Sequence, residues 1–186
     1  MKNLSMYFTL SFFLVFNCSK RNDNAEKIRK TVEYSTGILN KRINEIIWEF
    51  NVNKVKGVDK QKKMKNLYDE TLKIHKIARK MIYDLDDIDS SVDLKKSALI
   101  YFDESLNYID NYIKPIALMS FEELHEADSL HLMFYESNVK MVEETKKFQK
   151  SIEEFCNEFG LVKELPYLNE KDFEKQKLEA EKALGI

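Results

Sequence analysis

The sequence predicts an all-α protein, an antiparallel up-down four-helix bundle with an apolar helix before it and a short helix after it. Two observations carry this prediction. The 186 residues include four glycines and two prolines, so the chain favours a few long elements over many short ones. Apolar residues also recur at steps of three, four or seven through four long segments, which is the spacing of one helical face. Short turns between such segments make consecutive helices antiparallel neighbours.

The first two bundle helices are expected over residues 25–52 and 59–85. Gly57 marks the turn between them, and Asp59 is the expected cap of the second. The apolar stripe of the first comprises Ile28, Val32, Leu39, Ile43, Ile46 and Phe50. Ile47 and Trp48 widen that stripe. The stripe of the second comprises Met64, Leu67, Thr71, Ile74, Ala78, Met81 and Leu85. Such regular steps of three and four suit a seam packed against other helices.

The third helix is expected after an acidic turn, where Ser90 with Asp93 three residues later offers an N-terminal cap. Its apolar stripe comprises Leu94, Ala98, Leu99, Phe102, Leu106, Ile109 and Ile113. Pro115 disfavours the helical conformation at Lys114, so the helix should end or kink there. The turn is therefore expected near residues 114–119.

The fourth helix is expected to begin at Ser-Phe-Glu-Glu, residues 120–123, which is a capping-box pattern, and to end at Gly160. Its apolar stripe comprises Leu130, Phe134, Met141, Thr145, Phe148, Ile152, Phe155 and Phe159. Residues 161–168 contain Pro166 and are expected to be a linker, and residues 170–184 a short charged helix. The sequence thus divides into a bundle at 26–160 and a C-terminal segment at 161–186.

The first seventeen residues have the pattern of a signal peptide. Lys2 is followed by a stretch from Leu4 to Phe16 of thirteen residues without a charge, which is too short to cross a membrane of about 30 Å. The sequence Leu-Val-Phe-Asn-Cys, ending at Cys18, resembles a relaxed lipobox, at which bacterial lipoprotein precursors acquire a diacylglyceryl thioether and are then cleaved before the cysteine. Residues 18–25 are then a lipidated cysteine and a short tether. The alternative is an apolar N-terminal helix, or an uncleaved anchor with an incidental cysteine.

Lipid on Cys18 would make the membrane a partner of the exported protein, because each buried methylene contributes about 0.8 kcal/mol. Ser19 follows the cysteine, so there is no aspartate of the kind that retains some lipoproteins at an inner membrane. An outer membrane or the cell surface is therefore the favoured location.

Charge and cysteine content bear on two further questions, whether the protein binds nucleic acid and whether it contains a disulfide. Without residues 1–17 the chain has 29 basic and 32 acidic side chains, interspersed, which argues against nucleic acid as a partner. Cys156 is then the one remaining thiol, so no internal disulfide is possible. It lies in an apolar stretch and is expected to be a small buried hydrophobe, the alternative being a reactive thiol.

Catalytic and metal-binding patterns are sparse. Three histidines, one apolar-flanked thiol and no Gly-x-Ser-x-Gly elbow predict that the protein is not an enzyme and needs no cofactor. Glu122 and His125 have the spacing of di-iron ligands, but no second pair exists and cap or surface roles are favoured. The aspartates of the turn at 84–89 lack the glycine and glutamate of a calcium loop, so a solvated turn is favoured there.

The aromatic residues are expected to fill the core. A cavity between the helices is the alternative, with Tyr101, Tyr108 and Tyr112 as its candidate lining because a phenol keeps its hydroxyl near water.

Residues 89–160 carry a family resemblance. The opening Leu-Lys-Lys-Ser-Ala at 94–98, the Tyr-Ile-Asp at 108–110 and the ending Phe-Cys-Asn-Glu-Phe at 155–159 resemble small all-helical bacterial surface lipoproteins, best known among leptospiral-type surface proteins. The resemblance implies surface exposure and a helical bundle, and it implies no catalytic residues. We therefore expect a non-catalytic module of the bacterial envelope that binds an unidentified protein or has a structural role. The alternative is a bundle that binds a small ligand or metal ion.

Overall fold

The structure, a computed structural model, describes residues 2–52, 58–119 and 128–162, and the regular elements within these ranges are all helices, with no strand. Side chains are described for 21–50, 61–119 and 133–162. The helices are α1 (Lys2–Val52), α2 (Val58–Tyr83), α3 (Leu94–Tyr108), the π-helix η1 (Ile109–Ile113), α4 (Lys114–Leu118) and α6 (Asp128–Phe159). The predicted all-α class is confirmed.

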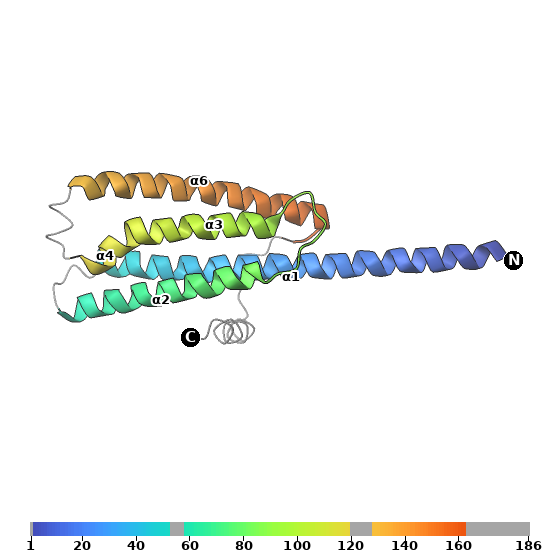
Figure 1. The fold of residues 1–186 in the computed structure, drawn as a ribbon, viewed down its shortest axis with the longest axis horizontal. Helices are drawn as coiled ribbons and strands as arrows, with labels where there is room; N and C mark the ends of the chain where they lie inside the picture. The colour runs from blue at the N-terminus through green and yellow to red at the C-terminus, as the bar shows by residue number, and fades with distance from the viewer. Residues whose placement is uncertain (1, 53–57, 120–127, 163–186) are drawn as a thin grey trace.

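The helices lie alongside one another, and α1 extends far beyond the others at its N-terminal end (Figure 1). The most extensive packing joins α1 to α2 and α3 to α6, whereas α1 and α6 touch much less. None of the helices in the described ranges is both long enough and apolar enough to cross a membrane.

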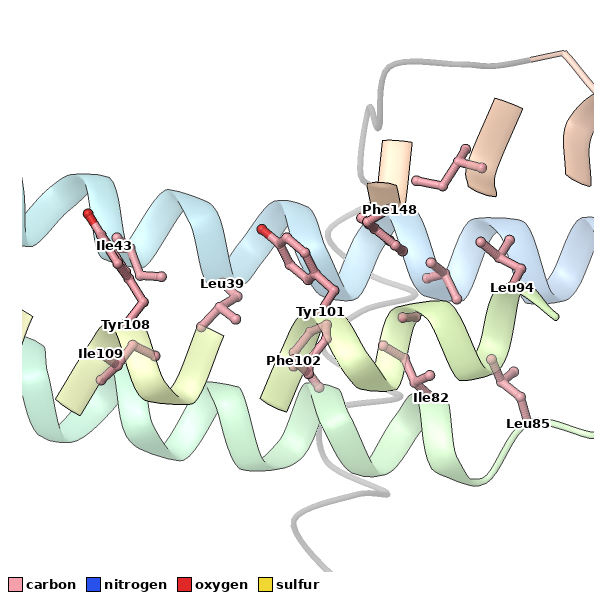
Figure 2. Close-up of a cluster of buried hydrophobic side chains, with 14 of the residues drawn as sticks. Leu39, Ile43, Ile82, Leu85, Leu94, Tyr101, Phe102, Tyr108, Ile109 and Phe148 are labelled. Carbon is pink, nitrogen blue, oxygen red and sulfur yellow. The ribbon is translucent and has the colours of Figure 1, made fainter. Parts of the chain in front are cut away.

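The predicted apolar stripes meet in one core. Figure 2 shows Leu39 of α1, Phe102 of α3 and Phe148 of α6 in this core, together with Ile82 of α2, which belongs to no predicted stripe. Met81 of the α2 stripe is buried in a second small cluster with Ile77. The stripe of α1 is buried at Ile28, Val32, Leu39, Ile43 and Ile46, as the spacing predicts.

Two residues assigned to these stripes are exposed. Trp48 is 62% exposed because it follows Ile46 by two residues, about 200° around the helix and therefore on the opposite face. Leu106 lies at the edge of the buried face of α3, which is centred nearer Tyr101 and Phe102.

The start of the bundle also differs from the expected plan. Residues 18–25, expected to be a tether, continue α1 as helix. Neither glycine nor proline occurs before Gly37, so nothing in this stretch interrupts helical hydrogen bonding.

Of the end or kink expected at Lys114, the helix end is wrong, because a π-helix joins α3 to α4. Lys114 is helical, with φ −60° and ψ −49°, and its N–H donates to the Ile109 carbonyl five residues back. The π-turn places Pro115 in the first turn of a new helical segment, where no N–H is required. The helix instead ends after Leu118, and Met119 is extended.

The C-terminal cap of α6 is the predicted one, whereas the N-terminal cap of α3 differs from the prediction. Asp93 is itself the N-cap of α3 and accepts from the Lys96 N–H at 2.8 Å, so the expected cap at Ser90 is wrong. Gly160 ends α6 with φ +62°, as predicted, and the Leu161 N–H donates to the Cys156 carbonyl at 2.8 Å. The capping box at 120–123 and the helix at 170–184 lie outside the described residues.

Candidate functional site

A cleft of about 420 Å³ opens between α1 and α6, with α3 at its floor. It lies between two helices that pack against each other much less than α1 packs against α2 or α3 against α6. Its lining comprises Asn40, Ile43, Asn44, Ile47, Tyr101, Tyr108, Asn138, Met141, Val142, Thr145, Lys146 and Gln149. We call it the α1–α6 cleft.

Two tyrosines of α3 form the floor of the α1–α6 cleft. Figure 2 shows Tyr101 and Tyr108 directed toward α1. Both rings are buried, with Tyr101 stacked on Phe148 at 4.7 Å and Tyr108 stacked on Tyr112 at 4.9 Å between ring centroids. Burial raises the pKa of both phenols, which therefore stay protonated at neutral pH. Core packing, the favoured expectation for the aromatic residues, is thus confirmed for Tyr101 and Tyr108, and both also line a cleft, as in the alternative.

Each phenol holds an asparagine on a different wall. Tyr101 donates its hydroxyl hydrogen to Asn40 Oδ1 on α1 at 2.9 Å, and Tyr108 donates to Asn138 Oδ1 on α6 at 3.2 Å. Because the amide oxygens face the phenols, the two Nδ2 groups keep their hydrogens for another acceptor.

The rims of the α1–α6 cleft are partly apolar and exposed. Val142 on α6 is 52% exposed, and Tyr135, two turns earlier on the same face of α6, is 68% exposed. A second, shallower groove of about 740 Å³ lies between α1 and α2, shares Asn40 and Asn44, and carries the exposed Trp48. The C-terminal part of α1 therefore borders a groove on two sides, one shared with α6 and one shared with α2.

A buried ion cluster lies on α1 nearer its N-terminal end. The Arg29 guanidinium, 3% exposed, donates to Glu26 at 2.8 and 3.0 Å and to Glu33 at 2.6 Å. The hydrogen bonds from Arg29 lower the pKa of Glu26 to about 2. This cluster satisfies charges that the helix buries among apolar neighbours.

The end of the bundle next to Cys18 is fastened by Arg21. Its Nη2 donates to the Asp89 carbonyl at 2.6 Å and pairs with Glu158 at 3.2 Å, and its guanidinium lies 4.9 Å from the centre of the Phe159 ring. One side chain thus joins α1 to the turn before α3 and to the end of α6.

Glu158 holds the turn before α3. Its Oε2 accepts from the Ser90 hydroxyl at 2.9 Å, the Ser91 N–H at 2.9 Å and the Ser91 hydroxyl at 2.6 Å. These hydrogen bonds, with the Ser91 hydroxyl first, lower the pKa of the Glu158 carboxyl.

Replacing Glu158 with alanine is expected to speed hydrogen exchange at the Ser91 amide, because that N–H loses its acceptor. Amide exchange read by NMR or mass spectrometry measures the change. Glu154→Ala, one turn earlier on α6 and paired with Lys150 at 3.5 Å, is the matched control and should leave Ser91 unchanged. Equal exchange rates in both variants would show that Glu158 does not order the turn.

His75 of α2 is buried and its Nε2 lies 2.7 Å from the Phe102 carbonyl oxygen. Burial is the main cause of its lowered pKa, so the ring is held neutral. The unfolded chain therefore binds a proton more readily at this site. The contribution of neutral His75 to the free energy of unfolding is fully present above pH 6.5, the ordinary histidine pKa. This contribution is lost as the pH falls below 6.5 toward the pKa of His75 in the folded protein.

We expect the urea midpoint of the protein to fall more between pH 7.5 and pH 5 than that of His75→Gln, which keeps a donor but does not titrate. Parallel urea titrations followed by circular dichroism give the comparison. The same pH dependence in both proteins would exclude His75 as its source.

The sequence-predicted metal candidates Glu122 and His125 lie outside the described residues, and the described residues hold no cluster of three or more metal-binding side chains. In the acidic turn, Asp84 pairs with Lys80 at 2.6 Å and Asp87 with Lys95 at 2.9 Å. Cys156 is buried, as predicted.

No protein-family model, curated protein or solved structure matches this chain. The resemblance to small helical surface lipoproteins therefore stays a prediction, and the site has to be interpreted from its own geometry.

Proposed function

We propose that this protein is an exported, membrane-anchored bacterial lipoprotein whose helices form an up-down four-helix bundle acting as a non-catalytic protein-binding or structural module of the envelope. Residues 1–17 are its signal peptide, lipid on Cys18 is its anchor, and the outer membrane or cell surface is its location. The observation that carries the binding role is the α1–α6 cleft, which combines oriented amide donors with exposed apolar rims.

The position of Arg21 supports the anchoring geometry. It fastens α1 to the body three residues after Cys18, so a lipid there would hold the end of the bundle at Glu158 against the membrane. From Arg21 to Asn40 is nineteen residues of continuous helix, or about 28 Å at 1.5 Å per residue. The α1–α6 cleft would then stand clear of the lipid headgroups, within reach of another protein.

The shape of the α1–α6 cleft favours a protein over a small ligand. Small-molecule sites bury roughly 70–90% of their ligand. Here Val142 at the rim is half exposed, and the two phenols on the floor already donate to Asn40 and Asn138. The alternative of a small ligand or metal ion predicts a bound mass in native mass spectrometry of protein purified without chelators.

The test is site-specific photo-crosslinking in the living bacterium. A photoreactive amino acid at Val142 should give a protein adduct, because this side chain lies on the rim of the cleft. The same amino acid at Lys65, an exposed position on α2, is the control and should give none. Absence of an adduct from position 142, or equal adducts from both positions, would contradict the proposed binding role.

A further inference from the structure

Two side-chain amides in the lining of the α1–α6 cleft, one on each wall, offer hydrogen-bond donors. The Nδ2 groups of Asn40 and Asn138 make no hydrogen bond within the described part of the chain, since each amide is engaged through its oxygen. They are held by Tyr101 and Tyr108, which lie seven residues apart on α3, or about 10 Å along the helix. The cleft therefore presents one donor on each wall, offset by about two helical turns along the axis of α3.

The charge of the α1–α6 cleft has one sign. Lys146 is the charged residue of its lining, and no carboxylate lines it. Among the described residues Lys146 has no ion-pair partner, whereas its neighbours Lys147 and Lys150 pair with Glu144 and Glu154. An occupant with acceptor groups and negative charge complements this lining.

The form of the α1–α6 cleft suits a helix. Its walls are residues 40–47 of α1, about 10 Å long at 1.5 Å per residue, and residues 138–149 of α6, about 16 Å long. Ile43 and Ile47 on one wall and Met141 and Val142 on the other supply apolar contacts along it. Recognition of an amphipathic helix in a groove uses anchors at i, i+3, i+4 and i+7, which span about 10 Å, the length of the α1 wall.

We propose that the α1–α6 cleft binds an acidic amphipathic helix of a partner protein, with acidic side chains seven residues apart that accept from Asn40 and Asn138. Lys146 pairs with one of these carboxylates, and the apolar face of the partner helix packs between Ile47 and Val142. This inference rests on the proposed function, since it names the chemistry of the partner of the same cleft.

The experiment uses the Val142 photo-crosslinker in the full chain, with a second substitution in α6. Lys146→Glu should lower the adduct yield about tenfold, because like charges then face each other. Lys150→Glu, four residues farther along α6, introduces the same charge change outside the cleft lining and should keep the yield within about twofold. Both lysines are exposed, so both variants should retain the helical circular dichroism spectrum.

The outcomes separate the two proposals. No protein adduct from the Val142 crosslinker alone overturns the proposed function, and this inference with it. An adduct whose yield is the same with Lys146→Glu overturns the inference alone. Peptide sequencing of the adduct gives a second measurement: the crosslinked segment should have helical apolar spacing with acidic residues seven apart, and a basic or non-periodic segment overturns the inference.

Discussion

Replacing Arg29 with alanine is expected to lower the free energy of unfolding by about 3–5 kcal/mol, the usual cost of removing one partner of a buried ion pair. Arg29 is almost fully buried and donates to both Glu26 and Glu33. Its removal takes the guanidinium away from the buried Glu33 carboxylate, which remains in a poorly solvated place. Urea unfolding followed by circular dichroism measures the loss as a lower midpoint at unchanged slope.

Arg42→Ala is the matched control for Arg29→Ala. Arg42 lies on the same helix and pairs with Glu45 at 2.7 Å with the spacing i,i+3, but both side chains are about one-third exposed. A partly exposed pair of this kind contributes at most about 1 kcal/mol. If the two variants lost similar stability, burial would not be what makes the Arg29 cluster important.

The Arg29 cluster also has a pH signature. The pKa of Glu26 is lowered to about 2 from an ordinary 4.5, so its contribution to stability is present above pH 4.5 and is lost as the pH falls toward 2. The loss of this contribution begins below pH 4.5, whereas the loss of the His75 contribution begins below pH 6.5.

The helices were predictable because apolar spacing reports directly which face of a helix is buried. The α1 stripe from Ile28 to Ile46 is one example, and the C-terminal glycine at 160 is another. Pro115 shows the limit of this reasoning. The rule about proline concerns both the missing N–H and the clash of its ring with the preceding turn, and the π-turn at Ile109–Ile113 changes the hydrogen-bond pattern of that turn just before Pro115.

The candidate site was only partly predictable. The tyrosines of α3 were named from their stripe, but Asn40 and Asn138 were not. Asn40 directly follows the buried Leu39, and a polar residue at that edge of a stripe is ordinarily solvated. What makes it part of a site is the sparse packing of α1 against α6 and the cleft between them, which depend on tertiary structure and leave no periodic signal. The buried position of Arg29 was also not predicted, because charged residues are seldom fully buried.

Replacing Cys18 with alanine is expected to abolish acylation of the protein and to release it from membranes. The thiol of Cys18 is the proposed attachment point, and two or three acyl chains at about 0.8 kcal/mol per methylene are what would hold the bundle on a bilayer. Metabolic labelling with a clickable palmitate analogue, followed by membrane fractionation, measures both effects. The chain supplies its own control, because its other cysteine, Cys156, is buried in the core.

Cys156→Ala should therefore keep the label and the membrane association, with stability as the property that changes. Membrane retention and labelling that persist in Cys18→Ala would contradict the lipoprotein assignment. Labelling lost with retention kept would instead identify residues 1–17 as an uncleaved anchor. In the proposed orientation, loss of lipid at Cys18 would remove an anchor three residues before Arg21, which joins α1 to the turn before α3 and to the end of α6. The proposed height of the α1–α6 cleft above the membrane would then no longer be fixed.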